Sequence, residues 1–452
     1  MSSSSPPPPS SDQKKKSAAA GSEPELITVE EQEEFLRVIK QLNLASAPAD
    51  RPAPPSVAAD HKFWKTQPVP QSEAEELALA SADAARAHGP IDAPKTVADV
   101  RAEPYAMPAG FVWSEIDFLQ PEQAREVYEL LTHNYVEDDD AMFRFDYSVE
   151  FLTWALTPPG YHRDWHIGVR SQASNKLLAF ISGIPVTATV YASAVPMAEV
   201  NFLCVHKKLR AKRLAPVLIK EVTRRVNLRD IWQAVYTAGV MLPMPLASCR
   251  YFHRSLNPKK LIEVGFSPLP PRMTITGVIK SLSLPAKPAT PGFRAMEPRD
   301  VPAVTALLKA YLSKFHLTAA YAEDEVRHWM LPRDGVINSY VVENPASHAI
   351  TDFCSYYHLP STIIGNDKYR TLHAAYSFYN VATSVPLAAL MQDLLVVAKK
   401  EKHDVFNALN LMENEEFLQP LKFGPGSGEL QYYLYNWRCP RMTPGAIGIV
   451  LC

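Results

Sequence analysis

The sequence predicts an α/β fold made of two similar halves, each a mixed, twisted sheet flanked by helices. Stretches typical of strands alternate with stretches typical of amphipathic helices in residues 198–266, and the same order returns in residues 372–437. A strand–helix–strand succession is typical of a sheet with helices on its faces. Because the order occurs twice, we expect two tandem units related by a pseudo-two-fold axis.

The first unit begins with the apolar stretch 198–205, which predicts a strand. Residues 214–227 follow with apolar residues at helical spacing, and Pro216 is tolerated there because it falls in the first turn. Residues 231–236 then predict a second strand, and a further apolar stretch covers residues 261–266.

The second unit repeats this order. Residues 372–381 predict a strand, residues 387–400 a helix and residues 405–409 a second strand. The unit is completed by a short apolar stretch, 421–423, and a strand-like stretch, 430–437. The matching order is the evidence for duplication.

Length and composition place these units behind a leader. A chain of 452 residues exceeds what one core usually serves. Residues 1–59 are rich in Ser, Pro, Ala and Gly and predict a mostly disordered leader, with a short helix at 30–44. We expect one half in residues 60–285 and the other in residues 286–452, joined near a Pro-rich stretch.

The composition excludes several function classes. A net charge of −2 argues against bulk attraction to DNA or RNA. The sequence has no long apolar run and no signal-peptide core, so we expect a cytosolic protein without a membrane segment. The five cysteines are scattered, which predicts reduced thiols and no metal site. Three consecutive lysines at 14–16 are either a solvated tail or a weak contact for an anionic membrane or ribosomal RNA.

The strand, turn and helix of residues 199–220 have the layout of an anion site. Free backbone amides at a helix start attract phosphate, and the turn before this helix is strongly basic. Coenzyme A, with a pyrophosphate and a further phosphate, would suit so many cations, although a solvated basic face is the alternative. The turn also resembles the R-x-x-G-x-A turn of GNAT-type acetyltransferases, with Arg213 at the glycine position. Its cations are Lys207, Lys208, Arg210, Lys212 and Arg213.

Residues 199–207, EVNFLCVHK, resemble the signature of the protein N-myristoyltransferase family. The resemblance extends over residues 60–452 and leaves only the leader outside. It implies two GNAT-like halves and transfer of myristate from myristoyl-CoA, a co-substrate, to an N-terminal glycine, with no cofactor bound permanently. The other matching stretches are FWKTQPV (63–69), YTAG (236–239), CRYFHR (249–254), YSFYN (376–380) and KFGPG (422–426).

The resemblance also assigns the catalytic groups. The backbone amides of Phe202 and Leu203 would form an oxyanion hole for the thioester carbonyl, and the α-carboxylate of Cys452 would be the base. Asn201 and Thr237 would hold the acceptor amine. Because a free carboxyl titrates about four pH units below an α-amine, burial must narrow this gap, and the apolar run 447–451 suits a buried anchor.

Myristoyl-CoA would be bound by two regions. Phe63 and Trp64 match the family's adenine end, although both are also plausible core anchors. The remaining residues follow the signature strand and its basic turn. They are Leu203, Cys204, Val205, Arg210, Ala211, Lys212, Arg213, Leu214, Ala215 and Pro216.

A second set would bind the acceptor peptide. The acidic run at 137–140 is by itself typical of a solvated loop, but its flanks resemble the family's peptide groove. For His253, a purely structural role is the alternative to peptide binding. Ser427 stands where the family has aspartate, which predicts altered peptide preference. The set is Tyr135, Asp138, Asp140, Phe143, Phe145, Tyr251, His253, Ser377, Gly426, Ser427 and Gly428.

Two other functions stay open at this stage. The same site could acylate lysine side chains, or the chain could be a non-catalytic module that binds acyl-CoA and peptide. We reject a nucleotide triphosphatase because residues 422–428, KFGPGSG, lack the G-K-[ST] ending. We expect no metal at His162 and His166, since Pro158, Pro159 and Gly160 disfavour a helix there. We expect a monomer.

Overall fold

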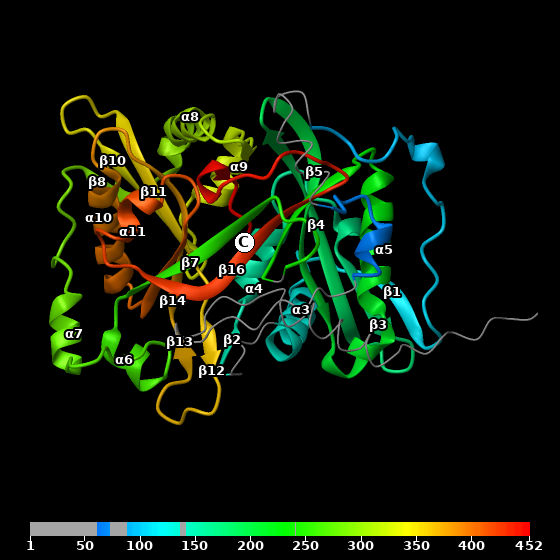
Figure 1. Cartoon of the computed structure of the whole chain (residues 1–452), viewed down its shortest axis with the longest axis horizontal. Coiled ribbons are helices and arrows are strands. Elements are labelled where there is room, and N and C mark those ends of the chain that lie inside the picture. The colour runs from blue at the N-terminus through cyan, green and yellow to red at the C-terminus, as the bar shows by residue number, and fades with distance from the viewer. Residues whose placement is uncertain (1–60, 73–87, 136–141, 240) are drawn as a thin grey trace, which may run out of the picture.

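The computed structural model describes residues 61–72, 88–135, 142–239 and 241–452. The leader and its expected helix lie outside these residues. Within them, one large mixed sheet runs through the molecule, with helices on both of its faces (Figure 1). The predicted α/β class is therefore confirmed.

The strands of this sheet come from both halves of the chain. In spatial order they are β1 (Phe111–Glu115), β3 (Ile167–Ser171), β4 (Leu177–Val190), β5 (Ser193–Val205), β6 (Gln233–Ala238), β16 (Gly424–Tyr435), β7 (Ala247–Ser255), β15 (Val405–Leu409), β14 (Ala374–Val381), β11 (Ile350–His358), β10 (Ile337–Glu343) and β8 (Phe293–Ala295). Two short strands, β9 (Leu317–Ala319) and β17 (Ile447–Gly448), join it beside β4. A separate small sheet holds β13 (Thr371–Leu372), β12 (Ser361–Ile363) and β2 (Phe143–Phe145).

The helices lie along and between these strands. The α-helices are α3 (Pro121–Asn134), α4 (Val149–Leu156), α5 (Leu214–Asn227), α6 (Pro258–Glu263), α7 (Ile275–Ser281), α8 (Val301–Leu312), α9 (Glu323–Met330), α10 (Leu387–Lys400) and α11 (Glu415–Leu418). Single 3₁₀ turns are η1 (Trp64–Thr66), η2 (Val97–Asp99), η3 (Arg163–Trp165), η4 (Lys207–Lys212), η5 (Pro298–Asp300) and η6 (Pro444–Ala446).

The predicted repeat is present as two parallel strand–helix–strand units. β5, α5 and β6 form the first unit, whose strands pair in parallel. β14, α10 and β15 form the second, also with parallel strands. The bounds of α5, α10 and β15 agree with the sequence prediction, whereas β6 lies two residues later than expected. The apolar stretch 261–266 covers the end of α6 and the turn after it.

Alternation along the strands places helices on opposite faces. On β4, Phe180 packs in the same core as α3, whereas its neighbours Ala179 and Ile181 pack in the core that holds α5. Helix α5 buries Leu214, Leu218, Val222 and Val226, which recur every four residues.

The two halves exchange strands in the middle of the sheet. Strand β16, near the chain's end, pairs with β6 on one side and β7 on the other. Strand β7, from the first half of the chain, pairs in turn with β15. The halves therefore share backbone hydrogen bonds. The boundary that we placed after residue 285 lies between α7 and β8 and stays a prediction.

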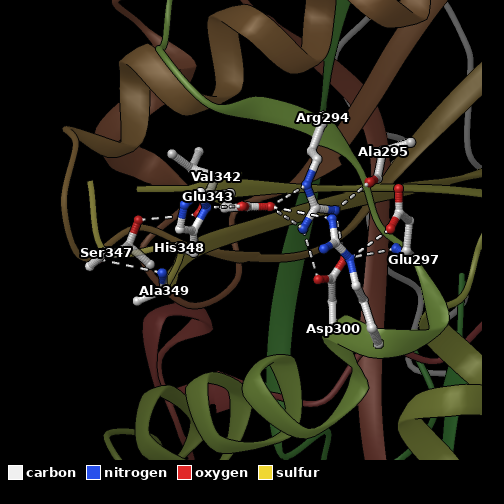
Figure 2. Close-up of polar contacts among 11 residues, drawn as sticks. Arg294, Ala295, Glu297, Asp300, Val342, Glu343, Ser347, His348 and Ala349 are labelled. Carbon is white, nitrogen blue, oxygen red and sulfur yellow. Dashed lines mark hydrogen bonds and ion pairs between the residues drawn. The ribbon is translucent and has the colours of Figure 1, made fainter. Parts of the chain in front are cut away.

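An ion network anchors the start of the second half. Figure 2 shows Arg294 between the carboxylates of Asp300 and Glu343. Its two terminal nitrogens donate to Asp300 at 2.7 and 2.8 Å, and its Nε donates to Glu343 at 2.8 Å. Burial raises the pKa of Asp300, but the hydrogen bonds from Arg294 and from the Glu297 amide outweigh it, so the pKa lies below its usual value. This network joins β8 and η5 to β10.

We predict that Asp300→Asn lowers the free energy of unfolding by about 1–3 kcal/mol at pH 7, which is roughly what hydrogen bonds to a charged group contribute. Because the pKa of Asp300 is lowered by folding, this stability is present above its unfolded pKa and is lost as the pH falls through the folded value. In urea unfolding, the difference from wild type should shrink below about pH 4. Arg299→Ala removes an exposed side chain whose ion pairs are with Glu297 and, at 3.5 Å, Glu343, and it should cost far less; equal losses would contradict this assignment.

Candidate active site

The signature strand β5 contains a bulge. Phe180 pairs with Cys204 and Ser182 pairs with Asn201, so two residues of β5 stand opposite one residue of β4. The backbone of Phe202 has a φ of +54°, in the left-handed region that non-glycine residues seldom adopt. The bulge takes the amides of Phe202 and Leu203 out of the regular ladder. The Phe202 amide instead donates to the Asn201 side-chain oxygen at 2.9 Å.

The side chain of Phe202 is a core residue. It is 1% exposed, and its ring lies 5.2 Å from the ring of Tyr147 and 6.1 Å from that of Tyr135. The aromatic packing holds the bulge in place. Any chemical role of residue 202 therefore belongs to its backbone.

The basic turn after β5 leads into α5 through a second left-handed residue. Arg213 has a φ of +52° and a ψ of +34° and is the N-cap of α5. This conformation explains why glycine is usual at the matching position of GNAT turns. Asn134, at the end of α3, holds the turn: its side-chain oxygen accepts from the Lys207 amide at 3.0 Å, and its carbonyl accepts from Arg210 at 2.6 Å.

A cavity of about 540 Å³ lies between the bulge, the start of α5 and β6. Its volume is in the usual range for a bound small molecule, and most of its lining side chains are apolar. Ten residues predicted from the sequence line it: Phe63, Trp64, Tyr135, Asn201, Phe202, Leu203, Arg213, Ala215, Pro216 and Thr237.

Other lining residues were missed by the sequence prediction. They come from α5, from β5, from β6 and the residues beside it, and from β16. Helical spacing from Pro216 was the signal that could have found those on α5. Trp64 stacks on one of the missed residues, Tyr236, at 5.7 Å. Trp64 is therefore both a core anchor and a cavity wall. The missed residues include Val200, Val217, Ile219, Lys220, Trp232, Tyr236, Leu242 and Tyr435.

Not every residue predicted to bind myristoyl-CoA lines the cavity, and Arg210, which donates to the Asn134 carbonyl, is not among the lining residues. Cys204, Val205 and Leu214 are at most 2% exposed and belong to the core. Burial raises the pKa of the Cys204 thiol to about 12, so this thiol stays protonated at neutral pH. A ligand can meet these residues only through their backbone. Ala211 and Lys212 are part of η4.

The apolar tail is a buried anchor, as its sequence predicts. Ile447 and Gly448 form β17, parallel to β9. The Tyr432 hydroxyl donates to the Ile449 carbonyl at 3.1 Å, and the Val450 amide donates to the Tyr379 hydroxyl at 3.1 Å. Neither tyrosine was predicted to hold the tail.

The tail places Cys452 beside the β5 bulge. The Asn201 side-chain nitrogen donates to the Cys452 backbone oxygen. The same side chain accepts from the Phe202 amide, so Asn201 bridges the tail and the bulge. Thr237, on β6, pairs with Tyr432 and lines the neighbouring cavity. Residues 201, 202, 237 and 452, which are far apart in the sequence, thus meet at one place.

Of the predicted peptide-groove residues, Tyr135 lines the large cavity, whereas two others lie beside the tail. Tyr251 and Ser377 line a small cavity together with Val450 of the tail. His253 Nδ1 contacts the Asn407 side-chain oxygen at 2.6 Å, and its Nε2 is buried without a hydrogen-bond partner in the described structure. A Cβ on Gly426 would collide with this ring, so only glycine fits. 

A wide bulge carries the glycine-rich segment. Residues 426–428 of β16 stand between two pairs made with β7, and the Gly426 carbonyl accepts from Arg250 at 2.8 Å. Ser427 is exposed and Gly428 is buried. Phe143 and Phe145 are buried on β2, with Phe145 6.4 Å from Tyr376. Asp138 and Asp140 lie outside the described residues.

Comparison with known proteins identifies the family. Residues 90–249 match "Myristoyl-CoA:protein N-myristoyltransferase, N-terminal domain", and residues 263–448 match the C-terminal domain of the same family. Glycylpeptide N-tetradecanoyltransferase 1 of Arabidopsis thaliana is 57% identical over 397 residues, which cover 88% of this chain and 90% of that protein. The chain belongs to the protein N-myristoyltransferase family. It is therefore an acyltransferase.

Other N-myristoyltransferases agree in sequence and structure. Glycylpeptide N-tetradecanoyltransferase 2 of Bos taurus is 51% identical over 430 residues, covering 95% of this chain and 84% of that protein. A crystal structure of Saccharomyces cerevisiae N-myristoyltransferase with bound myristoyl-CoA superposes with a TM-score of 0.82 at 44% identity, covering 87% of this chain and 99% of that one. A second such structure gives 0.83 at 42% identity and covers 93% and 99%.

The part of the chain that the structure describes has neither a metal-binding cluster nor a membrane-spanning helix. It contains no group of three or more His, Cys, Asp or Glu residues able to hold a metal ion. None of its helices is both long enough and apolar enough to cross a bilayer. His162 and His166 flank the 3₁₀ turn η3 and adopt extended backbone conformations.

Proposed function

We propose that this chain transfers the myristoyl group of myristoyl-CoA to the N-terminal glycine amine of acceptor proteins by direct attack, without an acyl-enzyme. The observation that carries this proposal is the meeting of Cys452, Asn201 and the β5 bulge beside the large apolar cavity. Family membership and the myristoyl-CoA in the yeast structures support the choice of acyl donor. The buried, protonated Cys204 argues against a thiol nucleophile.

The thioester carbonyl would be polarised at the bulge. Backbone amides that are held in place before the reaction stabilise the negative charge that develops on the oxygen in the transition state. One such donor typically lowers the activation free energy by about 3–4 kcal/mol. The Phe202 amide now contacts the Asn201 side chain, so it would exchange that partner for the substrate oxygen. The Leu203 amide would be the second donor.

The α-carboxylate of Cys452 would accept the proton of the acceptor amine. In water this transfer is unfavourable by roughly four pH units. The apolar tail and its tyrosines exclude water, which raises the pKa of a carboxyl and lowers that of an ammonium. Asn201 and Thr237 would orient the amine, and the close walls would exclude larger N-terminal residues.

The phosphates of myristoyl-CoA would lie against the basic turn and the start of α5. Backbone amides at a helix start and nearby cations together attract phosphate. Arg213 lines the cavity at this point. The acceptor peptide would lie over Tyr251, His253 and Ser377, where the exposed Ser427 in place of aspartate removes one charge-assisted contact.

The activity test uses purified protein, myristoyl-CoA and a peptide that begins with glycine. We expect thiol release and a matching gain in peptide mass. A peptide with a blocked N-terminus and an internal lysine tests the lysine alternative, and we expect it to react much more slowly. Binding of myristoyl-CoA without thiol release would contradict the proposal and favour a binding module. That the protein is cytosolic and monomeric, and that its leader contacts the ribosome, stay predictions.

Arg213 allows backbone strain to be separated from phosphate binding. Arg213→Gly should be more stable than Arg213→Ala by about 1 kcal/mol, because only glycine adopts the left-handed conformation without penalty. Both variants lose the cation and should bind coenzyme A equally weakly compared with wild type. Thermal unfolding and calorimetric titration measure the two effects. Equal stability of the two variants would refute the strain, and unchanged affinity would refute the phosphate contact.

A further inference from the structure

The proposed mechanism leaves one acidic side chain of the signature unused. Glu199 lies on β5 two residues before Asn201, so both side chains are on the same face of the strand. It forms no hydrogen bond or ion pair with any residue that the structure describes. Glu199 is half-buried, and a carboxylate that is partly removed from water without a partner is costly.

Glu199 shares a small cavity with the end of the chain. Cys452, Tyr321, Trp329 and Glu325 line this cavity with it. The large apolar cavity is a separate one, because neither Glu199 nor Cys452 is among the residues that line it. The volume of the small cavity, about 20 Å³, is enough for a water molecule.

The groups that face Glu199 come from four other parts of the fold. Burial is the main cause that raises the pKa of Tyr321, of Tyr379 on β14, of Tyr432 on β16 and of the Cys452 thiol, and the charge of Glu199 adds to each shift. Tyr379 and Tyr432 are the same tyrosines that hold the tail. Burial raises the pKa of Glu199 itself to about 8.

We propose that Glu199 is the second proton acceptor of the reaction and takes from the Cys452 carboxyl the proton that this group removes from the acceptor amine. This inference rests on the proposed function. The Cys452 carboxylate accepts a proton from the ammonium, and Glu199 then accepts that proton and restores the carboxylate. The amine attacks the thioester, a C–N bond forms and the C–S bond breaks. The departing thiolate takes the second proton of the nitrogen, and Glu199 later releases its own to solvent.

A second acceptor compensates for the difference of about four pH units between the pKa values of a free carboxyl and an α-amine. A proton left on the Cys452 carboxyl would return to the amine, whereas a neighbouring acceptor with a pKa close to that of the amine can retain it. Two carboxyl groups near one site also raise each other's proton affinity. Glu199 does not touch the substrate. It acts through Cys452, whose carboxylate it restores, and is therefore a positioning residue.

The test compares kcat of wild type and Glu199→Gln from pH 6 to 9 with the same glycine peptide and saturating myristoyl-CoA. The ionisation of the peptide amine is common to both proteins and cancels in the rate ratio. We expect this ratio to be near one at pH 6, where Glu199 is protonated, and to rise to about tenfold by pH 9, less than a group acting directly on substrate contributes. Myristoyl-CoA affinity should not change.

Three comparisons complete the experiment. Glu199→Asp should retain the pH-dependent ratio in reduced form, and Glu325→Gln, in the same cavity, should follow the wild-type profile. Without substrates, Glu199→Gln should gain melting temperature relative to wild type as the pH rises from 5 to 8, because the folded carboxyl of wild type keeps its proton in that window while the unfolded one is already ionised, so wild type loses stability. A rate ratio that is constant with pH overturns the inference. If wild type itself transfers no acyl group, the proposed function fails instead.

Discussion

One residue added after Cys452 should abolish nearly all acyl transfer, whereas Cys452→Leu should keep it. The tail is fixed by the Tyr432 and Tyr379 hydroxyls and by Asn201, so its end cannot retreat. An added residue would move the α-carboxylate by about 3.3–3.6 Å and place a neutral amide beside Asn201. A positioned base typically contributes about 10²–10⁴-fold in rate, and we expect a loss of this size in kcat.

Single-turnover kinetics with myristoyl-CoA bound in advance measures this loss. Affinity for myristoyl-CoA should be unchanged, because the large cavity does not include Cys452. Cys452→Leu is the matched control: burial raises the pKa of the Cys452 thiol well above its usual value, so the thiol is protonated and has no basic role. Activity in the extended protein together with inactivity of Cys452→Leu would assign the base to the thiol.

The sequence predicted the elements that local patterns determine. Helices α5 and α10 and strand β15 have the expected bounds, because apolar residues at a helical or strand period report directly which face is buried. Part of the lining of the large cavity was also predicted, since the strand, basic turn and helix that contribute to it are consecutive in residues 199–220. Binding of acyl-CoA there stays a prediction.

Contacts between distant segments could not be predicted in this way. The exchange of β7 and β16 depends on pairing between residues about 180 positions apart, which no local period reports. Phe202 gives no sign in the sequence of its left-handed backbone, because aromatic residues favour regular strands. The roles of Tyr379 and Tyr432 depend on where the tail returns, and Glu199 gains its unusual pKa only from the cavity that the tail closes.

Asn201→Leu should lower kcat by about 10²–10³-fold while leaving myristoyl-CoA affinity intact. The Asn201 side chain connects the two parts of the proposed mechanism, donating to the Cys452 oxygen and accepting from the Phe202 amide. Leucine has a similar volume but neither contact, so the base loses its position and the bulge loses its partner. The expected loss is that of one preorganised polar group in an active site.

Two variants decide which contact of Asn201 matters. Asn201→Asp keeps an acceptor for the Phe202 amide but places a second carboxylate against Cys452, so like-charge repulsion should displace the base and kcat should fall as far as in Asn201→Leu. Ser182→Ala removes only the hydroxyl that donates to the Asn201 backbone carbonyl at 2.9 Å, and should cost about 1 kcal/mol of stability with little change in kcat. If Asn201→Asp instead keeps wild-type kcat, the contact with Cys452 is dispensable, and the role of Asn201 is confined to the bulge.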